Sequence, residues 1–207
     1  MAGEEIIYVV DDDRRFLAAL ERSLRSLKLH VKTYTAARNF LAKIEPDRPG
    51  CVITDLKMPD MDGIALQEAL RERQIRIPII FITGHGDATT AVTALKGGAV
   101  DFLEKPFNEK TLFDSVRQAL AKDATDRALT AERSVVRDRY ENLSPREREV
   151  FALVVSDLPN KEIARRLKIS PRTVEHHREH VMLKMQANSL AELITMAVLC
   201  GVHELHL

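Results

Sequence analysis

A cluster of acidic side chains stands near the start of the chain, in the segment IIYVVDDD. Asp11, Asp12 and Asp13 directly follow the apolar run at residues 6–10. Close-set carboxylates repel one another and resist burial, so the cluster needs a solvated turn, a cation or both. A hard cation of the magnesium type binds carboxylate oxygens and keeps several waters, so one or two aspartates and a phosphate oxygen suffice. The structural alternative is that Asp13 caps the following helix.

Polar side chains also stand at the ends of three later apolar runs, namely Asp55, Thr83 and Lys105. If Asp12 and Asp55 hold Mg²⁺ and Asp11 acts through water, the cation and the Lys105 ammonium neutralise phosphoryl oxygens. The Thr83 hydroxyl then hydrogen-bonds one of these oxygens. An exposed aspartate is ionised at neutral pH, so Asp55 needs no general base to attack phosphorus. The set predicts formation of an aspartyl phosphate.

Short apolar runs alternate with helical patterns as far as residue 122. We expect strands at 6–10, 31–34, 51–55, 77–83 and 101–107, and helices at 14–27, 36–44, 62–73, 87–96 and 109–121. Runs that are apolar throughout are typical of strands covered on both faces, and the alternation predicts an α/β domain with a flavodoxin-like, doubly wound five-stranded parallel sheet. Ligands of such sheets bind at the carboxyl ends of the strands. The polar strand ends should therefore meet at one rim.

The composition changes after residue 122. Residues 123–143 contain no Gly or Pro and many helix formers, so we expect a helical linker between a first domain at 1–122 and a second at 144–207. Leu129, Val136 and Leu143 are seven residues apart. A seven-residue spacing is typical of a coiled-coil dimer seam, but a seam also needs a second set of apolar positions, which this segment lacks. A solvated helix is therefore the favoured interpretation.

The second domain shows a series of helix starts. Ser144, Pro145 and Glu147 form a capping box, and Asn160 can cap the helix KEIARRLK. Ser170 precedes the helix RTVEHHREHVMLKM, and a last amphipathic stretch covers 190–199. Two short helices joined by a tight link are typical of a small all-α helix-turn-helix domain.

The second helix of this motif has two different faces. Val174, Val181 and Met185 should face the core. The opposite face is either an ordinary solvated surface or a candidate surface for a DNA major groove, and it carries Arg172, Glu175, His176 and Glu179. Further candidate contacts, mostly to the DNA backbone, are Lys161, Ser170, Thr173, His177, Arg178 and Lys184. Residues 144–207 hold nine basic and eight acidic residues, so their net charge contributes little attraction for DNA.

Other features limit the classes of function. The adjacent His176 and His177 point to different faces of a helix and have no Cys or carboxylate at ligand spacing, so we expect no zinc site there. The two cysteines, Cys51 and Cys200, are far apart in the sequence. They are typical of free thiols in a protein from a reducing compartment. The charge is balanced, with 31 basic and 31 acidic residues, and no apolar run is long enough to span a bilayer. These features predict a soluble, cytoplasmic protein.

The motifs VVDDD, ITDLKMPDMDG, FITGHGD and AVDFLEKPF together resemble the receiver domain of bacterial two-component response regulators, over residues 4–122. The resemblance implies that Asp55 is the phosphoacceptor and that Asp11 and Asp12 are the acidic pair. It implies the main-chain carbonyl of Lys57 as a further Mg²⁺ ligand, beside Asp55 itself.

The same resemblance implies a cis peptide bond before Pro106. Phe102 aligns with an aromatic switch residue that turns inward when the Thr83 hydroxyl is drawn to the phosphoryl group. Plain core packing is the alternative for Phe102.

The segments LSPREREVFALV, LPNKEIARRLKISPRTVEHHREHVMLKM and SLAELI resemble a LuxR-type DNA-binding domain of the FixJ branch, over residues 141–200. Asp157 departs from the pattern, which commonly has glycine there. The resemblance implies a transcription regulator rather than an enzyme, and activation is the commoner behaviour. Its partners would be a sensor histidine kinase, promoter DNA, RNA polymerase and, on phosphorylation, a second copy of the chain.

Two alternatives remain at this point. A phosphatase of the aspartyl-phosphate type would need a second acid or base two residues after Asp55, where Lys57 stands. A phosphorelay or adaptor protein would keep the phosphoacceptor without binding specific DNA.

Overall fold

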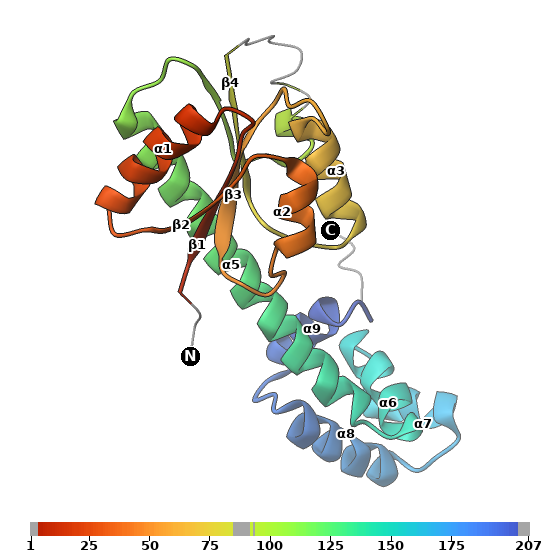
Figure 1. The fold of residues 1–207 in the computed structure, drawn as a ribbon. Coiled ribbons are helices and arrows are strands. Elements are labelled where there is room, and N and C mark those ends of the chain that lie inside the picture. The colour runs from red at the N-terminus through yellow and green to blue at the C-terminus, as the bar shows by residue number, and fades with distance from the viewer. Residues whose placement is uncertain (1–3, 85–91, 93, 203–207) are drawn as a thin grey trace. The chain divides into compact units, whose positions relative to one another are not determined.

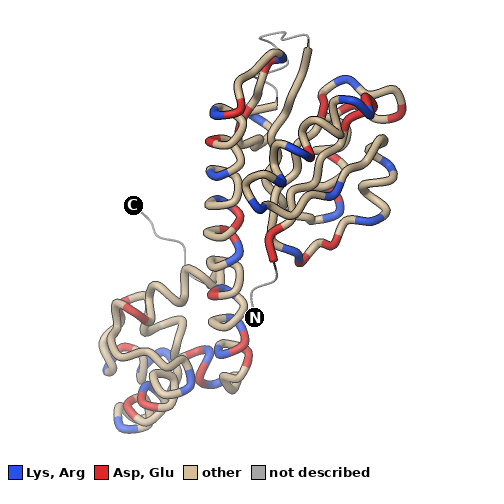
Figure 2. The backbone as a smooth tube through the Cα atoms, turned by 60° about the vertical axis from the view of Figure 1, so that its left-hand side comes forward, with Lys and Arg blue, Asp and Glu red and all other residues tan. Residues whose placement is uncertain are grey.

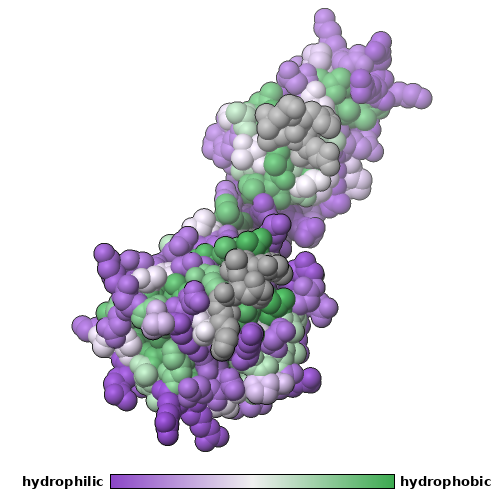
Figure 3. All heavy atoms as spheres, turned by 90° about the horizontal axis from the view of Figure 1, so that it is seen from above, coloured by the Kyte–Doolittle hydropathy of each residue, from purple (hydrophilic) through white to green (hydrophobic). Residues whose placement is uncertain are grey.

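The computed structural model describes residues 4–84, 92 and 94–202 (Figure 1). The chain divides into two compact units, residues 1–126 and 127–207. Figure 3 shows hydrophilic side chains over most of the visible surface of each unit, with smaller hydrophobic areas between them. Within the described ranges, no helix is long and apolar enough to cross a membrane.

The first unit is a five-stranded parallel sheet with strand order β2-β1-β3-β4-β5. Its strands are β1 (Ile6–Val10), β2 (His30–Tyr34), β3 (Gly50–Asp55), β4 (Ile79–Thr83) and β5 (Asp101–Glu104). Its helices are α1 (Arg14–Ser26), α2 (Ala37–Lys43), α3 (Gly63–Glu72) and the first part of α5 (Glu109–Glu141). Helices α1 and α5 cover one face of the sheet, and α2 and α3 cover the other (Figure 1). The predicted flavodoxin-like fold is confirmed, although most of the expected helix at 87–96 lies outside the described residues.

Both faces of strand β1 are buried, and this is why its apolar run contains no polar residue. Successive side chains of a strand point to opposite faces. Ile7 and Val9 enter the hydrophobic cluster beneath α1 and α5, whereas Tyr8 and Val10 enter the cluster beneath α2 and α3. All five residues of β1 are buried. Burial of each large apolar side chain stabilises the fold by roughly 1.5–3 kcal/mol.

The first residue of β3 needs to be glycine. Gly50 has φ +154°, and a Cβ placed there would lie 1.9 Å from the carbonyl oxygen of Ile6. Its N–H donates to the buried carboxylate of Asp123 in α5, at 3.0 Å. This contact fixes the start of a central strand against α5.

Helix α5 is continuous over 33 residues, where the sequence predicted a helix ending near 121 and a separate helical linker. No Gly or Pro interrupts it, and an ion pair of 2.7 Å joins Lys122 and Asp126 one turn apart. Figure 2 shows Lys and Arg interspersed with Asp and Glu along it. The expectation of a solvated linker is wrong for its last part, because Val136 and, just beyond the helix, Leu143 are buried in the core of the second unit, while Leu129 is exposed.

The second unit packs the end of α5 with α6 (Pro145–Val155), α7 (Asn160–Leu167), α8 (Pro171–Met185) and α9 (Leu190–Leu199). Val174, Val181 and Met185 are buried as predicted, and the capping box at the start of α6 is present. The helical character of this region and the helix-turn-helix formed by α7 and α8 are confirmed.

Two local details at the start of α7 differ from a standard pattern. The prediction that Asn160 caps α7 is wrong, because Pro159 holds the cap position and the side-chain oxygen of Asn160 accepts a hydrogen bond from Arg178 instead, at 3.1 Å. Asp157, in the turn before α7, has φ +57°. This left-handed conformation suits glycine better than aspartate.

Candidate functional site

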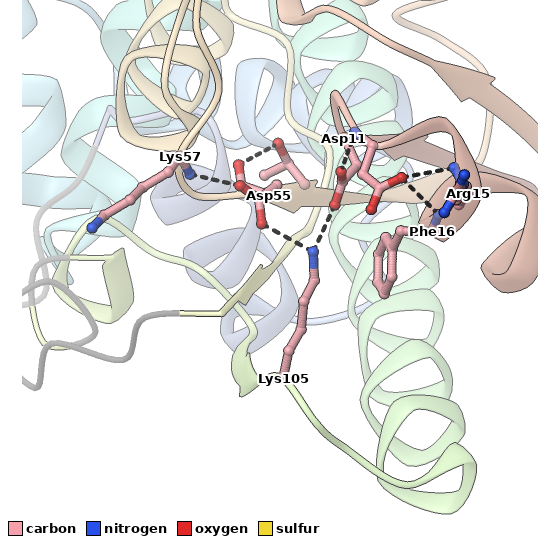
Figure 4. A network of polar contacts seen from close by, with 8 residues as sticks. Asp11, Arg15, Phe16, Asp55, Lys57 and Lys105 are labelled. Atoms are coloured by element: carbon pink, nitrogen blue, oxygen red, sulfur yellow. Dashed lines mark hydrogen bonds and ion pairs between the residues drawn. The ribbon is translucent and has the colours of Figure 1, made fainter.

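The polar strand ends meet at one edge of the sheet. Asp55 and Thr83 are the last residues of β3 and β4, and Asp11 and Lys105 directly follow β1 and β5. The four strands lie side by side and parallel, so their carboxyl ends share an edge. Figure 4 shows Asp11, Asp55 and Lys105 pointing toward one another from three different segments.

Lys105 joins the two carboxylates. Its Nζ lies 2.8 Å from Oδ2 of Asp11 and 3.2 Å from Oδ1 of Asp55 (Figure 4). The same ammonium stands 3.7 Å from the centre of the Phe16 ring, which adds a cation–π contact. The peptide bond between Lys105 and Pro106 is cis, as the family resemblance implied.

Asp55 is buried, which corrects the expectation of an exposed aspartate. Only 11% of its side chain is exposed. Burial raises the pKa of Asp55 above its ordinary value, while the Lys105 ammonium and the Lys57 N–H, 2.8 Å from Oδ2, act to lower it. Asp11 opposes them by repulsion. The negative charge on Asp55 therefore depends on Lys105 rather than on free contact with water.

The three adjacent aspartates take different positions. Asp13 caps α1, since its Oδ1 accepts hydrogen bonds from the N–H groups of Arg15 and Phe16 at 2.8 and 3.3 Å. Asp11 is buried and turns toward Lys105, whereas Asp12 is exposed. The structural interpretation is therefore confirmed for Asp13 alone, and the binding of a cation by Asp11 and Asp12 stays a prediction.

The oxygen groups at this edge fit a hard divalent cation. Asp11 and Asp55 both lie within hydrogen-bond distance of one ammonium, so two carboxylates share a single positive charge. Mg²⁺ needs only one or two carboxylates because it keeps several waters. Across the described ranges, no three Asp, Glu, His or Cys side chains are grouped as a complete metal site.

The other expected residues of this site are Thr83 and Phe102. Thr83 is buried at the end of β4. Phe102 in β5 is partly buried and packs against the cluster beneath α2 and α3. Its proposed role as a switch stays a prediction.

The candidate DNA surface lies on α8. Arg172, Glu175, His176 and Glu179 are exposed, as is Lys161 on α7. Ser170 caps α8 by accepting a hydrogen bond from the Thr173 N–H at 3.0 Å, and His177 is partly exposed.

Two of the expected DNA contacts are engaged within the unit. Arg178 donates to Asn160, and Nζ of Lys184 lies 2.7 Å from Oε2 of Glu147. Each must keep or exchange this partner if it is to reach a phosphate. The sequence marked Glu147 only as part of a capping box, but its side chain also faces His180, with Oε1 3.5 Å from Nδ1. Contacts between residues so distant in sequence carry no signal in helical periodicity.

Comparison with known proteins gives two family matches. The family of the response regulator receiver domain matches residues 7–117, and the family of bacterial regulatory proteins of the luxR type matches residues 141–197. The chain is 44% identical to transcriptional regulatory protein FixJ of Rhizobium meliloti (strain 1021), over 94% of this chain and 96% of that protein. It is 41% identical to nodulation protein W of Bradyrhizobium diazoefficiens, over 97% and 88%.

Two solved structures match nearly the whole chain. The response regulator StyR matches with a TM-score of 0.81 and 38% identity, over 95% of this chain and 99% of that one. Full-length FixJ from B. japonicum matches with a TM-score of 0.58 and 40% identity, over 98% and 100%.

Proposed function

Because this chain belongs to the response regulators that join a receiver domain to a LuxR-type DNA-binding domain, we propose that phosphorylation of Asp55 controls its binding to promoter DNA. The observation that carries the proposal is the shared ammonium of Lys105 between Asp11 and Asp55. A buried carboxylate held beside a single cation, at the ligand-binding edge of a parallel sheet, is suited to accept a phosphoryl group.

In the proposed reaction, a carboxylate oxygen of Asp55 attacks the phosphorus of a phosphohistidine on a sensor kinase. The new O–P bond forms as the P–N bond breaks, and the leaving imidazole nitrogen takes a proton from solvent. Lys105 stabilises charge on the transferred oxygens, and the Thr83 hydroxyl donates to one of them. Asp11, Asp12, Asp55 and the carbonyl of Lys57 would hold Mg²⁺, which would supply charge neutralisation at the phosphoryl group.

A small-molecule phosphodonor such as acetyl phosphate tests the acceptor. With Mg²⁺ present, intact-protein mass spectrometry should show one added phosphoryl group, which Asp55→Asn removes and EDTA greatly diminishes. Asp60→Asn is the matched control, because Asp60 is an exposed aspartate in the loop after β3. Undiminished labelling of the Asp55→Asn variant would exclude Asp55 as the acceptor.

The second domain is proposed to read DNA with the exposed face of α8. An Arg side chain can pair with guanine, and Glu can accept from cytosine in the major groove. Arg172→Ala or Glu175→Ala should lower affinity for promoter DNA by about 1–3 kcal/mol, measured by fluorescence anisotropy at fixed salt. The control is Arg71→Ala, which removes an exposed arginine of α3.

Phosphorylation is further proposed to favour a dimer, so that two copies of α8 contact two half-sites of the promoter. The dimer would work in the cytoplasm and activate transcription together with RNA polymerase. If the phosphorylated protein bound promoter DNA no better than random duplex, the adaptor alternative would replace this proposal. Turnover of an external phosphate ester is not expected.

A further inference from the structure

Two histidines of α8 lie one helical turn apart, at a spacing that differs from the adjacent pair considered above. The ring centroids of His176 and His180 are 4.2 Å apart, and the rings are tilted by 55°. The adjacent His177 is farther from His176, at 6.2 Å. His176 is exposed, and 46% of the His180 side chain is exposed. Both imidazoles are thus accessible from solvent on one side of the helix.

This spacing suits chelation of a transition metal. Two histidines at positions i and i+4 face the same side of a helix and can bind one metal ion. Metal–nitrogen bonds of about 2.0–2.1 Å at tetrahedral angles separate the two nitrogens by about 3.3 Å. Side-chain rotations can bring two nitrogens to that separation from rings whose centres are 4.2 Å apart.

The carboxylate of Glu147 lies beside one of these rings. Its Oε1 lies 3.5 Å from Nδ1 of His180, while its Oε2 accepts from Lys184 and from the N–H of Ser144. A carboxylate beside one ring nitrogen can orient the ring and leave the other nitrogen free. A small movement of the ring would bring Nδ1 into hydrogen-bond range of this carboxylate, as in the carboxylate–histidine pairs behind many bound metals.

We propose that His176 and His180 form a binding site for a divalent transition metal, with Nε2 of His180 as one ligand. The imidazole ligands favour Cu²⁺ over Ni²⁺ and Zn²⁺, and they select against Mg²⁺, which prefers oxygen. Two imidazoles leave further coordination positions open on such an ion, and water would occupy them. The site is distinct from the carboxylates at the sheet edge.

A consequence for DNA rests on the proposed function of α8. Direct contacts to base edges require side chains within about 3 Å of the bases. A hydrated ion on His176 would hold the helix face away from the groove, so metal and promoter DNA exclude each other. By linkage, each lowers the affinity for the other by the same factor.

Metal binding is tested on the full chain without DNA. Titration calorimetry with Zn²⁺ and electron paramagnetic resonance with Cu²⁺ at pH 7.5 should show a site apart from the sheet-edge carboxylates, with imidazole nitrogen coupling in the Cu²⁺ spectrum. His176→Ala and His180→Ala should each weaken this site at least about tenfold, in line with the loss of one chelating ligand. His177→Ala is the matched control and should change it less than twofold. Equal weakening by His177→Ala, or retention of the site in the double variant H176A/H180A, would overturn the proposal.

The effect on DNA is measured separately. In EDTA, the His180→Ala variant should bind promoter DNA like the parent protein, and added Zn²⁺ should weaken DNA binding by the parent but not by the variant. Failure to bind DNA in EDTA would refute the proposed DNA function and leave the metal site standing. Metal binding with no change in DNA affinity would refute the exclusion alone.

Discussion

Replacement of Glu147 by glutamine should destabilise the second domain in a pH-dependent manner. The Glu147 side chain is only 5% exposed and accepts from Lys184 and from the N–H of Ser144. Burial opposes its charge, but these hydrogen bonds outweigh burial and hold the pKa of Glu147 at about 2, against an ordinary value of 4.5. Gln at this position can still accept from the Ser144 N–H, so the substitution removes mainly the charge.

The magnitude follows from linkage. A pKa lowered from 4.5 to about 2 corresponds to an upper bound of about 3 kcal/mol. The side chains of Lys184 and His180 are 39% and 46% exposed, and solvent screening reduces the expected value to about 2 kcal/mol. Because the folded-state pKa is lowered, this stabilisation is complete above pH 4.5 and disappears as the pH falls toward 2. The difference between parent and variant should therefore shrink to less than half at pH 3.

The assay is hydrogen–deuterium exchange of peptides from α6 and α8 in the full chain, compared at pH 6 and, after correction for intrinsic exchange rates, at pH 3. Glu149→Gln is the matched control, because Glu149 lies on the same helix, is 53% exposed and should change stability by less than about 0.5 kcal/mol. A difference between parent and E147Q that is the same at both pH values would refute the electrostatic argument.

Three further substitutions test other parts of the structure. Lys105→Met removes the cation between two buried carboxylates, so the pKa of Asp55 should rise in an NMR titration. The receiver domain should lose about 2 kcal/mol of stability at pH 7 and less at pH 4. An unchanged pKa of Asp55 would contradict this reasoning. Gly50→Ala places a Cβ 1.9 Å from the Ile6 carbonyl oxygen and should cost at least about 2 kcal/mol in urea denaturation, whereas a neutral result would show that β3 can shift freely. Asp157→Gly relieves a φ of +57° and should raise the stability of the second domain by about 0.5–1 kcal/mol, and a loss of stability would mean that the aspartate side chain stabilises the turn.

The edge of the sheet could be predicted from sequence because its geometry follows from topology. Once the apolar runs are recognised as parallel strands, the residues that end them must share an edge, and Asp55 and Lys105 indeed meet there although they are 50 residues apart. The burial of Asp55 was not predictable in this manner. It depends on the three-dimensional packing around the strand end, and strand periodicity does not specify this.

In the second domain, too, some features could be predicted from the sequence and others could not. The faces of α8 follow from a period of 3.6 residues, so the burial of Val174 and Val181 was predictable. The partners of Asn160 and Lys184 were not, because each is set by the packing of one helix on another. The spacing of His176 and His180 is visible in the sequence, but only the structure shows the carboxylate of Glu147 beside the second ring.

The unbroken course of α5 has a practical consequence for anyone who divides the protein. A receiver fragment ending at residue 122 lacks Asp123, so the buried N–H of Gly50 loses its hydrogen-bond acceptor. An unsatisfied buried donor lowers the stability of the fragment by about 1–3 kcal/mol. A DNA-binding fragment beginning at residue 144 discards Val136 and Leu143, both members of its hydrophobic core. Well-behaved halves should therefore be cut near residue 127, inside the helix, and each should carry its own portion of it.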